Sequence, residues 1–536
     1  MTTPRQFNLA DLFEVVVDTV PDRLALVAGS VRSTYRQLDE RANRFAHHLE
    51  AQGVAPGAHV GILAHNCAEW VEAMIGCYKA RTVPINLNFR YVAPELRFVI
   101  DNADLQVLVF ERALFPLVEA SLSEDGETGT MHLLVIEDGS DATSSRLSAD
   151  GYEAALASAS PARDFGPRSP DDLYVLYTGG TTGMPKGVMW RQEDIFFAAM
   201  GGGGWGAEPI TRAEDLAGRL SADDASCVVM LVVGPLMHGN AQWAMWNAFM
   251  MAGTAVLYTE HRYDPDLLWR LIGQERVVSL ALVGDAMARP LADALASAPE
   301  GTYDTSSLFV IGSGGAMLSA TVKQELKAQL PNAMVMDRFG SSESGAQGAV
   351  EVGASGPKFV MSDDTSVLDD DLRPLNPGDG RIGHLARTGR IPLGYYKDPV
   401  KTEATFPTDA EGVRWSVPGD LASVEADGTI TILGRGSASI NSGGEKIFPE
   451  EVEAAVKTHP DVFDAIVVGI PDDRFGERVA VIVHTRPDAN LTIETLQQHC
   501  RGHIAGYKIP REMLLVDAIP LTAAGKPDAK AAKALF

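Results

Sequence analysis

The sequence predicts an α/β fold in which strands alternate with helices and a smaller domain follows. Two blocks, residues 8–120 and 173–350, alternate short apolar runs with helical patterns. Such alternation is typical of parallel, doubly wound sheets. The last hundred residues carry their own shorter pattern, and 536 residues are too many for one hydrophobic core. We therefore expect an N-terminal domain, residues 1–435, and a C-terminal α+β domain, residues 436–536.

The N-terminal stretch predicts an amphipathic helix and not a secretion signal. It lacks a basic region, and Asp11, Glu14 and Asp18 interrupt its apolar run. The longest apolar runs elsewhere, 227–233 and 243–252, fall short of the roughly 20 residues that a membrane-spanning helix needs. Four scattered cysteines without a CxxC pair fit a reducing compartment. We expect a cytoplasmic protein without integral membrane association.

The other elements follow along the chain. The first block predicts a helix at 69–80 and strands at 59–64, 105–110 and 132–137, the last within loops over 121–172. The second block predicts buried strands at 173–177, 227–233, 254–258, 277–283 and 308–311. The change to Gly, Pro and Asp with short alternating runs indicates a small β-rich unit over 351–434. The C-terminal part predicts helices at 449–459 and 493–501 and strands at 465–470 and 479–485.

Acidic residues outnumber basic ones by 71 to 45, which gives a formal net charge of −26. Such a field repels nucleic acid and anionic membrane surfaces, so neither is an expected partner. Any polyanionic ligand must then be bound by local donors. We interpret the charge as a solvated acidic surface in preference to a docking surface. The sequence leaves open whether the chain acts alone or as a homodimer.

The segment YTGGTTGMPKGV, residues 177–188, carries the most chemical information. It gathers hydroxyl donors and glycines ahead of one lysine: Thr178, Gly179, Gly180, Thr181, Thr182, Gly183 and Lys186. Glycines let backbone N–H groups turn toward a ligand, so this is the composition of a phosphate-binding loop. It is not a Walker loop, because Gly187 and not Ser or Thr follows Lys186. A plain Gly-rich surface turn is the weaker alternative.

Two other glycine runs do not have this composition. The run GGGG at 201–204 lacks threonine and lysine, and we predict a flexible loop there. The run IGSGGAM at 311–317 fails as a dinucleotide-binding motif, because Met317 stands where the last glycine is needed.

These segments together resemble the adenylate-forming superfamily, which includes acyl-CoA synthetases, luciferases and nonribosomal peptide adenylation domains. Further family segments occur in the family's order: GPLMHG (234–239), GSGGAM (312–317), DRFGSSE (337–343), GYYKDP (394–399), VPGD (417–420), GRGSASINSGGEKIFPEEVE (434–453) and PLTAAGK (520–526). The resemblance covers nearly the whole chain. It implies an N-terminal domain of two doubly wound α/β subdomains plus a small β-barrel, and a mobile C-terminal domain.

The resemblance also implies a nucleotide site. The matched positions are Thr178, Gly179, Gly180, Thr181, Thr182, Gly183, Lys186, Gly314, Gly315, Ala316, Asp337, Phe339, Gly340, Ser341, Ser342, Asp420, Arg435 and Lys526. Phe339 replaces a usual tyrosine and can still stack on adenine. Asp337 is expected to accept from the adenine amino group, and Asp420 from the ribose hydroxyls. Without the resemblance, Asp420 and Arg435 would be interpreted as surface residues at a strand end.

The expected chemistry requires cations. When a carboxylate attacks the α-phosphate of ATP, negative charge gathers around phosphorus, so cations and positioned donors are needed more than a protein nucleophile. Glu343 resembles the family's Mg²⁺ ligand, with Thr178 as the second expected ligand, and oxygen donors suit Mg²⁺. Lys526 matches the lysine that bridges the carboxylate and the α-phosphate. Without the resemblance, Glu343 would be interpreted as a solvated surface carboxylate.

The same resemblance implies the acid and CoA sites. The acid is expected to contact His238, Trp243 and Gly314. The expected catalytic residues are Lys526, Glu343, Thr178 and His238. The alternative for His238 is a histidine that only packs in the core. The channel for coenzyme A is expected at Ser442, Gly443 and Gly444. Ser437 stands at the family's hinge, which usually has Asp or Lys.

The implied activity is that of an AMP-forming acyl-CoA synthetase that uses ATP, Mg²⁺ and coenzyme A. The segments GVMWRQEDI (187–195) and INSGGEKIFPEEVE resemble actinobacterial synthetases for fatty acids or steroid side-chain acids. The apolar stripe AQWAMWNAFMM (241–251) fits a pocket wall for such acids, although spacing alone favours the core.

Two alternative functions stay open, because a carrier-protein acyl-AMP ligase and a luciferase-like enzyme share the adenylation site. A non-enzymatic nucleotide-binding module would not need a mobile lysine.

Overall fold

The computed structural model describes residues 5–122, 131–144, 146–178, 184–204, 208–220, 227–316, 318–353, 356–360, 362–435, 439–442, 445–472, 476–522 and 526–536. The chain forms two compact units. Unit 1 comprises Met1–Leu282, Pro299–Ile311 and Arg390–Ala404, and unit 2 comprises Val283–Ala298, Gly312–Gly389 and Thr405–Phe536. The predicted boundary between residues 435 and 436 falls inside unit 2 and stays a prediction.

One sheet of unit 1 has the strand order β19-β9-β8-β4-β3-β5-β6-β7. Its strands are β3 (His59–Leu63), β4 (Val83–Asn86), β5 (Leu105–Glu111), β6 (His132–Ile136), β7 (Asp150–Gly151), β8 (Leu173–Thr178), β9 (Lys186–Arg191) and β19 (Gly394–Tyr395). The strands from β8 to β7 run parallel, whereas β9 and β19 are antiparallel to their neighbours. Strand β19 pairs Tyr395 with Val188, although the two are far apart in sequence.

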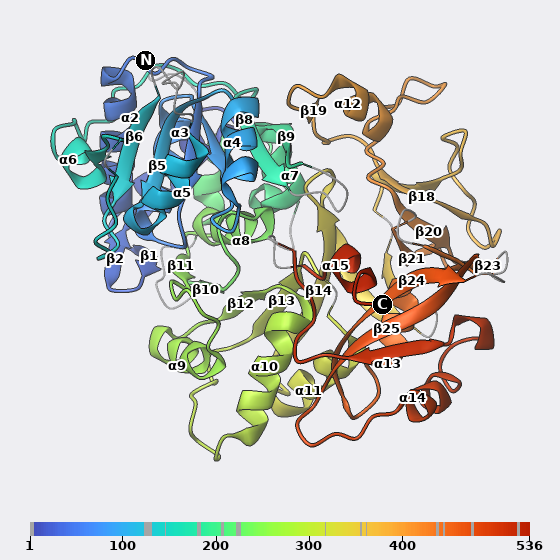
Figure 1. Cartoon of the computed structure of the whole chain (residues 1–536). Coiled ribbons are helices and arrows are strands. Elements are labelled where there is room, and N and C mark those ends of the chain that lie inside the picture. The colour runs from blue at the N-terminus through green and yellow to red at the C-terminus, as the bar shows by residue number, and fades with distance from the viewer. Residues whose placement is uncertain are drawn as a thin grey trace. The chain divides into compact units, whose positions relative to one another are not determined.

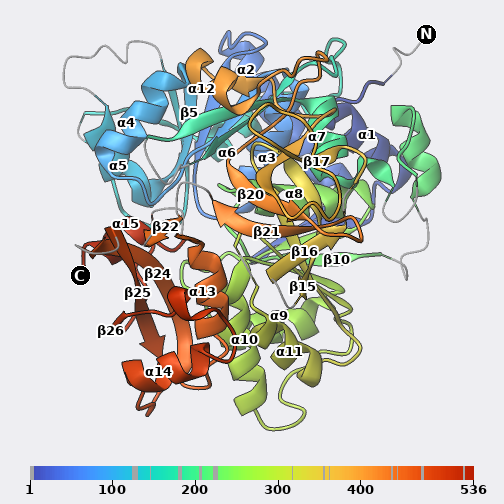
Figure 2. The same cartoon turned by 90° about the vertical axis from the view of Figure 1, so that its right-hand side faces the viewer.

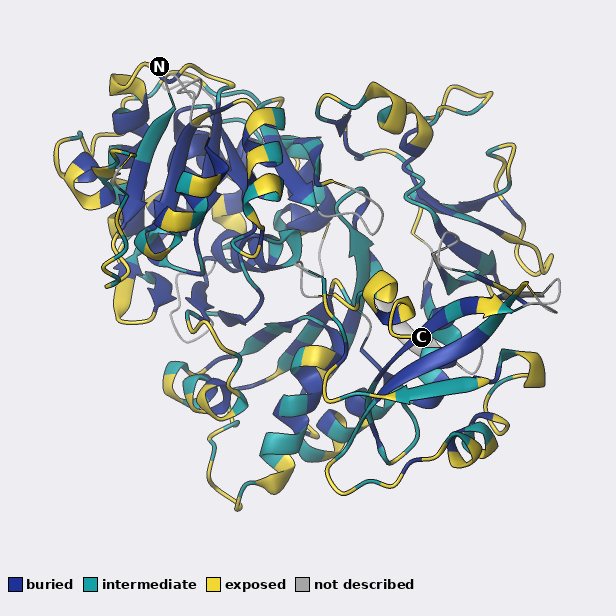
Figure 3. Cartoon of the chain, viewed as in Figure 1, coloured by how far each residue is buried: buried dark blue, intermediate teal, exposed yellow. Residues whose placement is uncertain are grey.

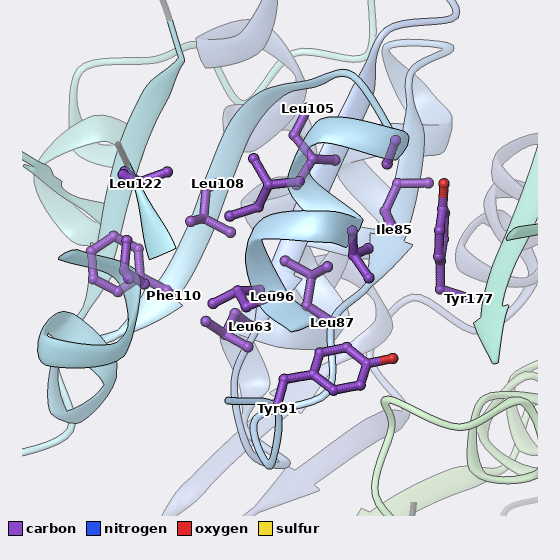
Figure 4. Packing of buried hydrophobic residues seen from close by; sticks show 14 of the residues in the cluster. Leu63, Ile85, Leu87, Tyr91, Leu96, Leu105, Leu108, Phe110, Leu122 and Tyr177 are labelled. Carbon is purple, nitrogen blue, oxygen red and sulfur yellow. The ribbon is translucent and has the colours of Figure 1, made fainter. Parts of the chain in front are cut away.

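Helices cover both faces of this sheet. Helices α4 (Ala93–Asn102) and α5 (Phe115–Ser121) lie on one face, and α2 (Tyr35–Ala51) and α3 (Ala68–Lys79) lie on the other (Figures 1 and 2). Figure 4 shows the core under α4, where Leu96 packs beside Leu63 and Leu108 from the strands. Most residues of these strands are buried, and the exposed residues gather mainly on the outer sides of the helices and on the loops (Figure 3). Apolar runs buried on both faces are what a parallel sheet requires.

The second sheet region of unit 1 has the order β12-β10-β11-β1-β2. Its strands are β1 (Leu24–Ala28), β2 (Val31–Thr34), β10 (Val229–Val232), β11 (Thr254–Leu257) and β12 (Ser279–Leu282). Its strands are parallel except for the β1–β2 hairpin. The further helices of unit 1 are α1 (Leu9–Thr19), α6 (Tyr152–Ala157), α7 (Gln192–Ala199), α8 (Gly239–Met250), α9 (Pro265–Glu275) and α12 (Pro399–Thr405).

Unit 2 contains an antiparallel sheet with the order β17-β18-β20-β21-β16-β15-β14. Its strands are β14 (Met334–Ser341), β15 (Gly345–Gly353), β16 (Gly356–Val360), β17 (Thr365–Leu368), β18 (Ile382–Arg387), β20 (Asp420–Val424) and β21 (Thr429–Arg435). Three elements come before this sheet in the chain: helix α10 (Gly284–Ser297), strand β13 (Val310–Gly314) and helix α11 (Ala320–Gln329). The β-rich texture predicted over 351–434 is confirmed.

The C-terminal part of unit 2 has its own sheet, in the order β23-β22-β25-β24, with β26 beside β25. The elements are β22 (Ile440–Ser442), β23 (Glu445–Ile447), α13 (Pro449–Val456), β24 (Val462–Asp472), β25 (Gly476–Thr485), α14 (Ile493–Cys500), β26 (Glu512–Leu515) and α15 (Ala529–Lys533). Val467 and Val481 are cross-strand partners in its apolar core. The predicted α/β class with a small α+β C-terminal part is confirmed.

Two local predictions differ from the structure. The loops over 121–172 also contain α6 and β7. The run at 201–204, predicted as a flexible loop, includes a short 3-10 turn over Gly201–Gly203 with positive φ at each glycine; a Cβ on Gly202 would lie 2.7 Å from Phe197 Cδ1. None of the described helices is both long and apolar enough to span a bilayer.

Helix α1 is present as predicted, but its acidic residues do not form a solvent-facing stripe. Asp11 and Glu14 are buried. The Lys79 ammonium lies 2.7 Å from Glu14, and the Arg168 guanidinium contacts both carboxylates. Burial alone would raise the pKa of Glu14, but Lys79 and Arg168 lower it to about 2. Cations from elsewhere in unit 1 therefore let these two acids enter the core.

Candidate nucleotide and acyl site

The Thr/Gly loop, residues 178–186, closes an antiparallel hairpin. Strands β8 and β9 pair with Thr178 opposite Lys186, so both residues flank the loop as cross-strand neighbours. The predicted donors Gly179, Gly180, Thr181, Thr182 and Gly183 lie outside the described residues. A Walker loop leads from a strand into a helix, so the hairpin agrees with the sequence-based distinction between the two kinds of loop.

Lys186 is held by a residue that the sequence did not single out. Its Nζ lies 2.9 Å from Asp398 Oδ2, and its side chain is 37% exposed. Asp398 also accepts from the Lys401 amide at 2.9 Å, at the start of α12. The hydrogen bond from Lys186 is the main cause of the lowered pKa of Asp398. Asp398 belongs to GYYKDP, so the pairing of β19 with β9 brings two family segments together.

Two buried asparagines tie the GPLMHG segment to the strand ends. The Asn86 amide donates to the carbonyls of Tyr177 at 2.8 Å and Met237 at 2.6 Å. The Asn66 amide donates to the Gly234 carbonyl at 3.1 Å. His238, half-buried, therefore stands directly after a backbone segment that is fixed beside the base of the Thr/Gly loop. Buried amides that satisfy backbone groups in this way are costly to remove.

Most of the apolar stripe on α8 belongs to the core. Met245, Trp246, Phe249 and Met250 are buried. The Trp246 ring lies edge-on to Phe13, with centroids 6.3 Å apart. These residues therefore pack in the core, as their spacing alone favours, and a pocket wall formed by this stripe stays a prediction. Trp243 is half-buried and remains the residue of this stripe that was proposed to contact the acid.

A second polar group lies at the ends of β3 and β5. His65 Nδ1 lies 2.6 Å from Glu111 Oε2, and the His65 and His261 rings stack at 3.9 Å with an interplanar angle of 14°. Their ligand atoms are close enough to share an ion. Imidazole nitrogens do not suit Mg²⁺, which prefers oxygen donors, and an ion cannot lie in the planes of two rings stacked in this way. This group is distinct from the predicted Mg²⁺ ligands.

In unit 2, the predicted adenine-binding segment follows β13. Gly314 is buried at the strand end, and Gly315 has a φ of +87°, which favours glycine. Asp285 accepts from the Ser319 amide at 2.8 Å, and Asp337 accepts from the Leu318 amide at 3.3 Å. Two carboxylates thus hold the backbone that follows Ala316.

Asp337 and Phe339 lie on β14. Asp337 is 6% exposed, and burial raises the pKa of its carboxyl to about 7, although the Leu318 amide and the Lys323 charge act in the opposite direction. Phe339 stacks on Phe359, with centroids 5.8 Å apart and an interplanar angle of 18°. One face of the Phe339 ring is therefore covered by protein, and stacking on adenine would use the other.

The raised pKa of Asp337 predicts a pH dependence of stability. Below about pH 4 the carboxyl is protonated in both the folded and unfolded states; between pH 4 and 7 the folded protein holds the proton more tightly, so stability falls as the pH rises. Asp337→Asn should remove a cost of up to about 4 kcal/mol above pH 7. Unfolding free energies of both proteins at pH 5 and 8 check this. A difference between the two proteins that does not change with pH would contradict it.

The residues from Gly340 to Glu343 lie at the end of β14 and in the turn to β15. A Cβ on Gly340 would lie 2.2 Å from the Gly345 carbonyl, so this position excludes a side chain. The Ser341 hydroxyl lies 3.0 Å from that of Ser344. Ser342 and Glu343 are half-buried at the tip of the turn. A carboxylate and a hydroxyl in one turn are an oxygen donor set that fits Mg²⁺.

The remaining predicted residues are spread over unit 2. Asp420 is buried and pairs in register with Arg435, whose side chain is not among those described. Ser442 is buried in β22. Ser437, Gly443 and Gly444 lie outside the described residues.

Lys526 lies in an exposed loop just before α15. The Thr522 amide donates to the Lys526 carbonyl at 2.7 Å, and the Lys526 amide donates to the Thr522 hydroxyl at 3.3 Å. Asp528 then caps α15 by accepting from the Lys530 and Ala531 amides. The Lys526 backbone is thus held by both hydrogen bonds to Thr522.

Comparison with known proteins gives a consistent family. The AMP-binding enzyme family matches residues 13–396, and the AMP-binding enzyme C-terminal domain matches residues 451–526. The medium/long-chain-fatty-acid–CoA/3-oxocholest-4-en-26-oate–CoA ligase of Mycolicibacterium smegmatis is 49% identical, covering 98% of this chain and 96% of that protein. The 3-oxocholest-4-en-26-oate–CoA ligase of Rhodococcus rhodochrous is 46% identical, covering 98% and 95%.

A solved structure has the same fold. The anthranilate CoA ligase AuaEII in complex with anthranoyl-AMP superimposes with a TM-score of 0.83 at 22% identity, covering 99% of this chain and 98% of that one. Together with the ordered motifs, these matches show that the chain belongs to the AMP-binding enzyme family, the adenylate-forming superfamily.

Proposed function

We propose that the protein is an AMP-forming acyl-CoA synthetase for hydrophobic carboxylic acids. The observation that carries this proposal is its similarity, at 46–49% identity over nearly the whole chain, to ligases named for fatty acids and for 3-oxocholest-4-en-26-oate. A carboxylate oxygen attacks the α-phosphorus of ATP, and pyrophosphate leaves. The thiol of coenzyme A then attacks the acyl carbon of the acyl-adenylate, and AMP leaves. Since ATP and coenzyme A are cytoplasmic substrates, we also propose a cytoplasmic location.

In this proposal, the Thr/Gly loop binds the departing pyrophosphate. Thr178 and Lys186 flank the loop as cross-strand partners, which supports a joint role. Before ATP binds, Asp398 neutralises and orients the Lys186 ammonium. A net charge of −26 makes such a locally placed cation necessary for a polyanionic substrate.

The residues of unit 2 are proposed to bind the nucleoside and the reacting groups. Asp337 accepts from the adenine amino group, Phe339 stacks on the ring, and Asp420 with Arg435 binds the ribose. Glu343, with Thr178, holds Mg²⁺, which neutralises phosphate charge when bound. Lys526 stabilises the charge that develops where the carboxylate meets the α-phosphate.

The second half-reaction is proposed to use other C-terminal residues. Ser437 acts as the hinge for rotation of residues 436–536, and Ser442, Gly443 and Gly444 form the passage for pantetheine. His238, Trp243 and Gly314 contact the acid. Because the stripe on α8 is mostly core, the preference for a hydrophobic acid rests on the relatives and not on this helix.

The test is AMP release in the presence and absence of coenzyme A, with acetate, octanoate, palmitate, benzoate and a steroid side-chain acid compared by kcat/KM. Octanoate should exceed acetate by roughly 10²- to 10³-fold, because each of its six additional methylenes gains up to about 0.8 kcal/mol on burial. Palmitate or the steroid acid should match or exceed octanoate.

Two outcomes would contradict the proposal in different ways. If acetate were the best acid, the hydrophobic preference would be wrong and the adenylation chemistry would stand. If acyl-AMP formed but coenzyme A did not accelerate AMP release, the acceptor would be a carrier protein or oxygen, as in acyl-AMP ligases and luciferase-like enzymes.

A further inference from the structure

The turn that carries Glu343 is short and needs support from outside. Strands β14 and β15 are joined by the Glu343 turn, residues 341–345, next to a register shift between Phe339 and Gly340. Within the turn, the Ser344 amide donates to the Ser341 carbonyl at 3.2 Å, and Gly345 has a φ of +67°. These local contacts leave the carbonyl groups of Glu343 and Ser344 facing other parts of unit 2.

Two buried side chains donate to those carbonyls. The Ser416 hydroxyl donates to the Glu343 carbonyl at 2.6 Å. Arg387 Nη1 donates to the carbonyls of Ser344 at 2.5 Å and Ala346 at 3.1 Å. Three carbonyls over four consecutive residues are therefore held from one side, by residues that lie more than 40 and 70 positions later in the chain.

The donors are themselves fixed. Arg387 Nε and Nη2 lie 2.8 and 2.7 Å from Asp364 Oδ2. The Ser362 hydroxyl donates to Asp364 Oδ1 at 2.6 Å. Burial alone would raise the pKa of Asp364, but the hydrogen bonds from Ser362 and Arg387 and the Arg387 charge lower it. The guanidinium therefore uses one edge for a carboxylate and the other for the turn.

The backbones of the two donors are also paired. The Arg387 amide donates to the Ser416 carbonyl at 3.0 Å, and the Ser416 amide donates to the Arg387 carbonyl at 2.7 Å. Arg387 ends β18, and its side chain is 8% exposed; Ser416 is fully buried. A buried charge with paired hydrogen bonds at every edge is rigid, because breaking one bond leaves an unsatisfied group.

From this arrangement we infer that Arg387 and Ser416 are positioning residues that hold the Glu343 turn in the geometry needed for Mg²⁺ and ATP. The inference rests on the proposed role of Glu343. It adds that the carboxylate and the Ser342 hydroxyl act at a fixed place because their backbone is anchored to the β17–β18 edge and to the 405–417 segment. Fixed ligands bind an ion with less loss of conformational freedom than mobile ones.

The decisive variant is Ser416→Ala, which removes one hydroxyl and no charge. The matched control is Ser121→Ala, where a buried serine in α5 donates to the Leu117 carbonyl at 2.7 Å. Two quantities are measured on each full-length protein. One is amide hydrogen exchange of residues 341–346 without ligand, and the other is the Mg²⁺ concentration for half-maximal acid-dependent ATP–pyrophosphate exchange.

Ser416→Ala should speed exchange of the 341–346 amides and raise the half-saturating Mg²⁺ concentration by about three- to tenfold, as expected for one lost hydrogen bond. Ser121→Ala should change neither. Arg387→Lys, which keeps the charge but cannot reach Asp364 and two carbonyls at once, should shift both quantities further. Unaltered exchange and Mg²⁺ dependence in Ser416→Ala, or an equal shift in Ser121→Ala, would overturn the inference.

The two measurements distinguish loss of the turn's anchor from absence of the proposed activity. If the wild-type protein catalysed no acid-dependent pyrophosphate exchange, the proposed function would fail. Hydrogen exchange of the turn would still decide whether Ser416 anchors it.

Discussion

Lys526→Ala is expected to reduce acyl-adenylate formation by about 10²- to 10³-fold or more, while thioester formation from synthetic acyl-AMP persists. Removing one preorganised donor aimed at developing charge costs this much in other enzymes. The loop around Lys526 is closed by two hydrogen bonds to Thr522, so the backbone should keep its place when the side chain is lost. In the second half-reaction the α-phosphorus is not attacked, and the ammonium has no charge to stabilise there.

The two half-reactions are measured separately, by ATP–pyrophosphate exchange and by single-turnover transfer from acyl-AMP to coenzyme A. Lys530→Ala, an exposed lysine in α15 four residues later, is the matched control and should leave both rates unchanged. Equal loss in both half-reactions would show that Lys526 supports the fold or a step common to both.

Glu343→Gln is expected to raise the Mg²⁺ requirement by about tenfold or more and to lower turnover at saturating Mg²⁺. Glutamine keeps the shape of the side chain but lacks the charge that attracts a hard cation. The Glu343 carbonyl, to which Ser416 donates, is unchanged in this variant. Hydrogen exchange of the turn should therefore stay at the wild-type rate, in contrast to Ser416→Ala.

A Mg²⁺ titration of pyrophosphate exchange provides the measurement, with Glu411→Gln as a control at an exposed loop position. If the titration curves of Glu343→Gln and the wild type coincided, Glu343 would not be the ligand. If exchange of the turn increased as well, the effect would come from disorder of the turn and not from lost charge.

The elements that the sequence predicts well are those whose signal is local. Strand β5 contains five apolar residues, all of which are buried, and any buried strand shows such a run. The Thr/Gly loop likewise carries its chemistry in consecutive residues. Prediction is weaker where one sequence pattern fits two environments. Trp243 and Trp246 both belong to the apolar pattern of α8, but Trp246 is buried in the core and Trp243 is half-buried.

The residues that could not be predicted act over long distances in the chain. Asn86 donates to a carbonyl 151 residues later, and Lys186 pairs with Asp398, 212 residues later. Arg387 is one of many arginines in a segment whose texture predicts only strands. Each is a single polar residue without a repeating neighbour, so its role depends on the tertiary fold. The buried pairing of Glu14 with Lys79 is of the same kind.

The pairing of β19 with β9 has a consequence for synthesis of the chain. Val188 leaves the ribosome long before Tyr395, its partner about 200 residues later. At 5–20 residues per second this interval is roughly 10 to 40 s. Throughout it, β9 is an open edge of an otherwise complete sheet, with backbone groups available to any passing strand. Residues 390–404 therefore cover this edge only late in synthesis. In a nascent chain stalled before them, the β8–β9 hairpin would expose an unpaired strand edge at which misassembly could begin.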